Sequence, residues 1–294
     1  SRFGTRAAAA GLLSWVSETF PGMLIGRTLG ATNLGVFNAA FNLARTPATA
    51  IATGGLEMLF ASGARADQSA TFRLRALKTG LGLVGLVSLP AFATLAAIPE
   101  TMVIVLYGPK WTAAMPLLPP LALAMPPLML AGVAGAMLAA MGRPGRDLLS
   151  QTMTAVFVTA GVLVAIGHST LAVTWVILAA MCGRMVLSLA MAMRLAGLGR
   201  GDLVRTLTPG LLLALITAPA VNFVDGWLGS LHIHRAIVLA ADAAAGVVLL
   251  TAGVFLLRGL IPVETRWPIA QALRRVPFGV TARLAPAFER GMPR

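Results

Sequence analysis

Long apolar runs, each about as long as a membrane helix, dominate this chain. A bilayer core about 30 Å thick needs roughly 20 mostly apolar residues per helix. Eight such runs occur, at residues 7–27, 34–62, 77–98, 112–141, 148–167, 170–193, 204–224 and 236–257. We therefore predict an all-α integral membrane protein with about eight transmembrane helices. They form a membrane domain over residues 1–258, and residues 259–294 form a basic cytoplasmic tail.

The composition excludes several other classes of protein. Charged residues make up 11% of the 294 residues and hydrophobic residues 57%, whereas soluble domains contain about 25% charged residues. So few charges cannot cover so much apolar surface, which excludes an ordinary soluble enzyme and a disordered chain. Cys182 is the single cysteine, so we expect no intrachain disulfide and no cysteine metal cluster.

The formal net charge of +13 raises the question of a polyanionic partner. Sorted by loop, 18 of the 23 Lys and Arg residues fall on one side of the predicted membrane. Arg27, Lys110 and Arg235 fall on the other side, and Arg45 and Arg184 lie within predicted spans. Cytoplasmic loops of membrane proteins are enriched in Lys and Arg. The charge therefore predicts a multi-pass membrane protein with both termini in the cytoplasm, and no nucleic-acid partner.

The basic tail leaves two interpretations open. The segment that begins at Trp267 combines apolar and basic residues, as segments that lie on an anionic membrane surface do. A loosely ordered, solvated tail fits the same composition equally well.

The second predicted span carries a regular polar pattern. Its polar residues are Asn38, Asn42, Arg45, Thr49 and Thr53, at spacings of 4, 3, 4 and 4. This period puts all five on one face of a helix. Polar side chains at membrane depth are costly and usually face protein, water or a ligand. The stripe therefore lines a substrate cavity or bonds to a neighbouring helix.

Three further charged residues fall within predicted spans. Glu18 is a candidate for ion coupling, or a counter-charge for Arg45. Arg184 suits bidentate contact with a phosphate, or else it caps carbonyl groups or pairs with Asp242. Asp242 is itself a candidate for ion coupling, with a purely structural role as the alternative.

The remaining polar patterns predict neither a metal site nor catalysis. His232 and His234 have no third ligand nearby, and zinc sites need at least three. The sequence contains no nucleophile elbow, zinc-protease helix or phosphate-binding glycine loop. We expect no enzymatic activity, no metal and no cofactor.

Two segments resemble a known family. Residues 25–48 contain Ile-Gly-Arg-Thr-Leu-Gly-Ala, then Leu-Gly-Val-Phe-Asn-Ala-Ala, then Pro47. Residues 105–118 contain Val-Leu-Tyr-Gly-Pro-Lys-Trp, followed by Ala113, Ala114, Pro116 and two leucines. Together with the turn at residues 140–143, they resemble the oligosaccharide flippases (polysaccharide precursor, O-antigen type) of the multidrug/oligosaccharidyl-lipid/polysaccharide exporter superfamily.

The resemblance implies a fold and a function. Such proteins have two pseudo-symmetric lobes around a central cavity, and they move undecaprenyl-pyrophosphate-linked oligosaccharide units across the bacterial inner membrane. This chain then corresponds to the second lobe plus two extra C-terminal helices. Its implied partners are the lipid-linked oligosaccharide, membrane lipids and a missing N-terminal lobe of about six helices.

On this alignment, Arg45 and Arg184 contact the pyrophosphate, and Asn38 and Asn42 contact the sugars. Glu18 is the candidate for ion coupling. Two alternatives stay open: a drug or peptidoglycan lipid-precursor exporter of the same superfamily, and a membrane scaffold or accessory subunit without transport.

Overall fold

The computed structural model describes residues 19–52, 69–231, 233–262 and 264–266. These residues form helices and turns, with no strand among them. A helical segment at residues 19–28 is followed by α2 (Gly30–Ile51), α4 (Ala70–Ala97), α5 (Pro99–Tyr107), the 3-10 segment η2 (Pro109–Leu117), α6 (Leu118–Ala140), α7 (Pro144–Ala165), α8 (Thr170–Ala196), α9 (Arg200–Ser230), α10 (Arg235–Leu256) and the 3-10 turn η3 (Leu257–Gly259).

The structure confirms an all-α membrane protein. Six helical stretches of the described residues are long and apolar enough to cross a membrane, and they coincide with the third to eighth predicted spans. The first two predicted spans appear as the segment at 19–28 and as α2, with the rest of both outside the described residues. The total of eight spans therefore stays a prediction.

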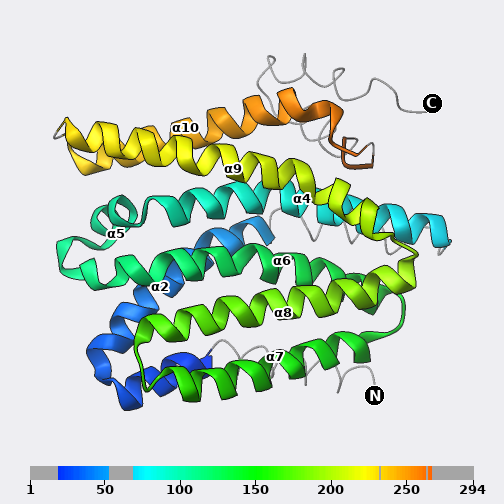
Figure 1. The fold of residues 1–294 in the computed structure, drawn as a ribbon, viewed down its shortest axis with the longest axis horizontal. Coiled ribbons are helices and arrows are strands. Elements are labelled where there is room, and N and C mark those ends of the chain that lie inside the picture. The colour runs from blue at the N-terminus through cyan, green and yellow to red at the C-terminus, as the bar shows by residue number, and fades with distance from the viewer. Residues whose placement is uncertain (1–18, 53–68, 232, 263, 267–294) are drawn as a thin grey trace.

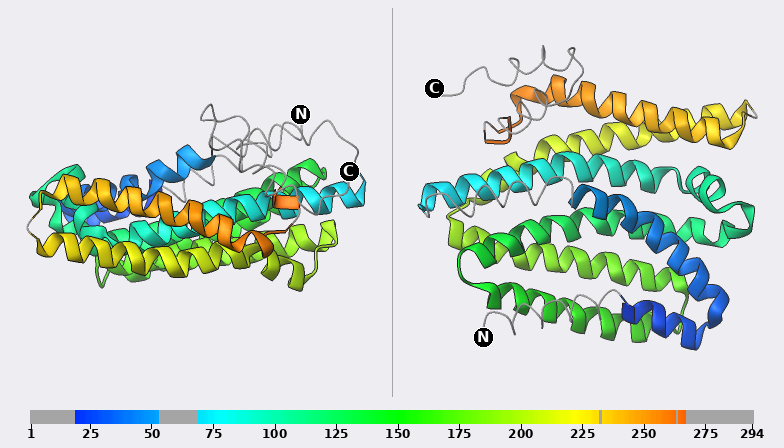
Figure 2. Two further views of the ribbon diagram at one scale, coloured as in Figure 1. Left: turned by 90° about the horizontal axis from the view of Figure 1, so that it is seen from above. Right: turned by 180° about the vertical axis from the view of Figure 1, so that it is seen from behind.

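The long helices lie side by side in one row. Figure 1 shows the order α10, α9, α4, α6, α8 and α7, and each helix contacts its neighbours in that order. Helix α2 lies across one face of the row, where it packs on α6, η2 and α4 (Figure 2, right). The opposite face of α2 therefore points away from the row.

Burial falls steeply from the middle of the row to its edge. In the apolar stretch of η2 and α6, 78% of the residues are buried within the protein, against 11% in α10. Helix α6 contacts α8, α4, α2 and α7, and it supplies much of the main hydrophobic core. Helix α10 is thus an edge helix with little protein around it.

Small residues bring α4 and α9 into close contact. A Cβ atom added at Gly210 would collide with the carbonyl oxygen of Gly85, so the two backbones pass with no side chain between them. Close approach through glycine is a common way for membrane helices to gain packing contacts. Nearer the basic end, Lys78 Nζ lies 3.3 Å from Asp202 Oδ2.

Basic residues cluster at one end of the bundle. The α6–α7 and α8–α9 turns meet at that end, together with the start of α4 and the end of α10 (Figure 1). The described cations there are Arg73, Arg75, Lys78, Arg143, Arg146, Arg194, Arg200, Arg205, Arg258 and Arg266. The opposite end carries Arg27, Lys110 and Arg235. The described cations therefore lie mostly at one end of the bundle, as predicted from counting Lys and Arg residues loop by loop.

Packing continues beyond Arg258. Ile261 and Thr265 are buried, and Thr79 Oγ1 of α4 donates a hydrogen bond to the backbone carbonyl of Glu264. The first residues of the expected tail therefore fold back on α4. Residues 267–294 are outside the described residues, so both interpretations of the tail, a membrane-surface segment and a solvated tail, stay open.

Candidate functional site

The polar stripe of α2 lies on the open face of that helix. Asn38, Asn42, Arg45 and Thr49 are all exposed. The face toward the row is apolar and buried, and consists of Phe37, Ala40, Leu43, Ala44 and Ala48. Helix packing thus follows the sequence period, and it leaves a line of amide, hydroxyl and guanidinium groups uncovered by this row. Thr53 and Glu18 lie outside the described residues.

Aromatic side chains hold the position of Arg45. Its guanidinium carbon lies 5.9 Å from the centre of the Phe41 ring, within the range of a cation–π contact. The Phe41 ring stacks on Phe37 with 5.8 Å between the ring centres, and Phe37 is anchored in the core. The Arg45 guanidinium is therefore positioned by the Phe41 ring, which in turn stacks on the buried Phe37 ring.

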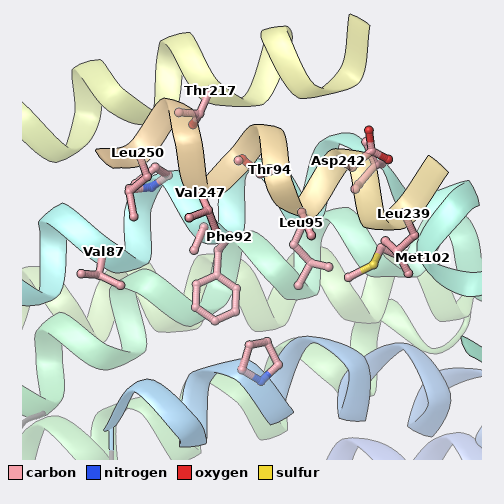
Figure 3. A pocket seen from close by; sticks show the side chains of 16 residues that line it. Val87, Phe92, Thr94, Leu95, Met102, Thr217, Leu239, Asp242, Val247 and Leu250 are labelled. Carbon is pink, nitrogen blue, oxygen red and sulfur yellow. The ribbon is translucent and has the colours of Figure 1, made fainter. Parts of the chain in front are cut away.

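A cavity of about 330 Å³ adjoins this helix at Pro47. Residues of α2, α4, α5, α9 and α10 line it, and Figure 3 shows Phe92 and Leu95 in its wall. Its polar side chains come from Thr94, Thr217 and Asp242; the other lining residues are apolar. Arg45 and Pro47 are two residues apart, which is about 200° around the helix axis, so the guanidinium and the apolar cavity lie on different sides of α2.

Asp242 lines the cavity, whereas Arg184 does not. The predicted alternative of an Arg184–Asp242 ion pair is wrong, because α6, α4 and α9 separate α8 from α10 in the row (Figure 1). Sequence spacing alone could not show which helices are neighbours. The structure therefore brings Asp242 near α2 and leaves Arg184 elsewhere.

Arg184 is half-buried beside a polar seam between α7 and α8. One turn further along, Ser188 Oγ donates a hydrogen bond to Ser150 Oγ at 3.0 Å. Gln151 Nε2 donates to Asp147 Oδ2 at 2.7 Å. Both bonds satisfy polar groups of α7, and the Ser188–Ser150 bond also ties α7 to α8. A phosphate-binding role for Arg184 stays a prediction.

The two segments that resemble a family pack against each other. A Cβ atom added at Gly35 would lie 3.9 Å from two ring atoms of Trp111. Trp111 and Tyr107 have ring centres 5.8 Å apart, so the two rings contact each other across the intervening turn. Gly108 between them has φ +88°, which favours glycine. The motifs thus form one contact that sets the position of α2.

The sequence analysis missed two polar residues near Asp242. Asp225 was left outside a span predicted to end at 224, but α9 continues to Ser230. Thr101 lies in the short helix α5, and its Oγ1 donates a hydrogen bond to Asp225 Oδ1. A longer helical window across residues 204–230 would have included Asp225. Among the described residues, no group of three His, Cys, Asp or Glu side chains is arranged to hold a metal.

Comparison with known proteins supports the family resemblance. A family model described as a polysaccharide biosynthesis protein matches residues 1–116. The comparisons support the resemblance of this chain to the polysaccharide exporter family. The lipopolysaccharide biosynthesis protein WzxC of Escherichia coli (strain K12) is 27% identical over 118 residues, which is 40% of this chain. That match spans 24% of the relative's length. The part of the chain that the family model matches contains α2, α4, α5 and the turn that holds Trp111.

Proposed function

We propose that this chain is part of a transporter that flips undecaprenyl-pyrophosphate-linked oligosaccharide units across the bacterial inner membrane. The family match and the similarity to WzxC support a polysaccharide-related transporter in general. The observation that carries the finer proposal is the exposed polar stripe on a helix whose other face is buried. In a membrane such a face needs water, ligand or protein opposite it.

The proposed ligand is amphipathic, and the surroundings of α2 likewise have a polar part and an apolar part. Arg45 offers a guanidinium that suits a pyrophosphate, because guanidinium groups bond phosphate oxygens bidentately. Asn38 and Asn42 offer amide donors and acceptors to sugar hydroxyls. The cavity beside Pro47 offers an apolar wall to the lipid chain. A second lobe opposite α2 completes the proposed cavity, and the basic end of the bundle faces the cytoplasm.

Arg45→Ala tests this proposal in cells that depend on the full-length gene for their surface polysaccharide. A lost charge-assisted hydrogen bond contributes roughly 1.5–3 kcal/mol, so we expect translocation to fall about 10- to 100-fold. The measurement is the amount of lipid-linked oligosaccharide that reaches the outer leaflet, normalised to the protein level.

Two variants control this experiment. Arg45→Lys keeps the charge and should retain intermediate activity. Arg194→Ala removes an exposed arginine from the last turn of α8 and should leave translocation unchanged. Normal translocation in Arg45→Ala would exclude the role given to that residue.

A further inference from the structure

Asp242 is a buried carboxyl group in a helix that buries little else. Asp242 and Val238 are the two fully buried residues of α10. The Asp242 side chain is 1% exposed, and no donor in the described part of the chain bonds either carboxyl oxygen. Removing a carboxylate from water costs several kcal/mol unless a partner compensates. The protein therefore needs something at this position that neutralises the charge.

A second carboxyl group, that of Asp225 on the neighbouring helix α9, lies close to the same site: Thr101 of α5 bonds Asp225, and the next residue, Met102, lines the cavity together with Asp242. Figure 3 shows the Asp242 side chain at the side of the cavity. Thr101 Oγ1 donates to Asp225 Oδ1 and so fixes the orientation of that carboxyl. An ionised carboxylate has only acceptors, whereas a protonated one has a donor. Two facing carboxyl groups therefore bond to each other when one of them is protonated.

We propose that Asp225 and Asp242 form a proton-binding site, in which one proton is held between the two carboxyl groups and joins α10 to α9. The site is separate from the polar stripe of α2 and needs no transported ligand. Its occupant is a proton rather than a metal ion, since the described residues supply two carboxylates and a hydroxyl but no third carboxylate or imidazole.

The other charged groups near α10 are already accounted for. Glu100 of α5 pairs with Arg235, with 2.7 Å between Oε1 and Nη2. His234 Nδ1 accepts a hydrogen bond from the backbone N–H of Ala236 and caps α10. The cavity-lining residues of α4 include no titratable group, and Arg258 beside η3 lies at the far end of α10. Within the described residues, Asp225 is therefore the titratable group that faces Asp242.

The site lies near one end of the bundle. Asp225 is about 8 Å along the helix axis from the end of α9, and Asp242 is about 10 Å from the start of α10, at 1.5 Å per residue. Loss of the proton leaves two negative charges side by side in apolar surroundings, where their repulsion is weakly screened. Because α10 is the least buried long helix, we expect this repulsion to loosen it from α9.

Infrared difference spectroscopy of the purified chain in liposomes tests the proposal. Spectra are recorded between acidic and alkaline buffers without sodium, and the signal is the C=O stretch of a protonated carboxyl group. We expect this band to disappear at alkaline pH in the unmodified protein. Asp242→Asn and Asp225→Asn should each shift the loss of the band to lower pH, because the remaining carboxyl group no longer has an ionised carboxylate beside it that favours its protonated form.

The matched control is Asp202→Asn, which removes a carboxyl group of the same helix, α9, that is paired with Lys78. This variant should keep the band. Circular dichroism checks folding, and Asp225→Asn alone decides the matter if Asp242→Asn does not fold. An unchanged band in a folded Asp225→Asn protein overturns the proposal. So does a sodium-induced spectral change at constant pH that Asp225→Asn removes. Neither result depends on whether the chain transports oligosaccharide.

Discussion

The open face of α2 and the α4–α9 contact differ in what lies against them. The polar residues of the α2 face are exposed, whereas the small residues between α4 and α9 are in close contact. Along α2 the polar groups are exposed, and only the apolar side of the helix is packed. Between α4 and α9, Gly85 and Gly210 bring two backbones together with no side chain between them. The α4–α9 contact is formed entirely within this row of helices, whereas the α2 face exposes polar groups that a ligand, water or protein outside the row can contact. Substitutions should therefore affect stability in the first region and function in the second.

The largest loss of stability is expected for Gly210→Ala. Its Cβ would collide with the Gly85 carbonyl, and an overpacked core costs typically about 1–3 kcal/mol. Gly226 is the matched control in the same helix, because no atom lies within 4 Å of a Cβ added there. Gly226→Ala should stabilise the protein by about 0.5–1 kcal/mol through helix propensity. Thermal unfolding in detergent micelles measures both variants, and a destabilised Gly226→Ala protein would contradict the comparison.

A smaller loss is expected for Trp111→Ala, at the contact between η2 and α2. This substitution removes the ring that contacts Gly35 and Tyr107, and we expect a destabilisation of about 1–2 kcal/mol, since the side chain is only half-buried. Translocation should fall as well, because the contact sets the position of α2. Trp111→Phe keeps an aromatic ring and should recover most of both quantities. An unfolding temperature equal to that of the unmodified protein would show that the contact is dispensable.

The smallest change in stability is expected for Asn42→Ala, on the open face. The side chain is exposed, so the free energy of unfolding should change by less than about 0.5 kcal/mol. Translocation should still fall by about 2- to 10-fold, because a neutral hydrogen bond contributes roughly 0.5–1.5 kcal/mol. Thr208→Ala, at a half-buried position on α9 whose hydroxyl donates to the Val204 carbonyl of the same helix, should change neither quantity. A large drop in stability with unchanged translocation would mean that the stripe is structural.

Much of the candidate site could be predicted from periodicity alone. The spacing of Asn38, Asn42 and Arg45 predicts one helix face, and that face is the open one. Tyr107 and Trp111 are four residues apart in the sequence, and their rings contact each other. These features are local, because they depend on helical geometry and on residues a few positions apart.

Partnerships between distant helices could not be predicted in the same way. Arg184 and Asp242 look like a natural ion pair in the sequence, yet three helices lie between theirs in the row. Asp225 was missed because the predicted span ended one residue too early. Nothing in the sequence alone indicates that Gly35 faces Trp111, or that Thr101 donates to Asp225.

The sequence by itself determined an all-α membrane protein with its cations gathered at one end, because apolar length and loop charge follow directly from the order of residues. Only the tertiary structure decided that α2 keeps its polar face open beside an apolar cavity, and that Asp242 of α10 lines that cavity. The physical reason is that helix neighbours are chosen by side-chain packing over the whole row. A single sequence records the period of each helix but not the partner it packs against.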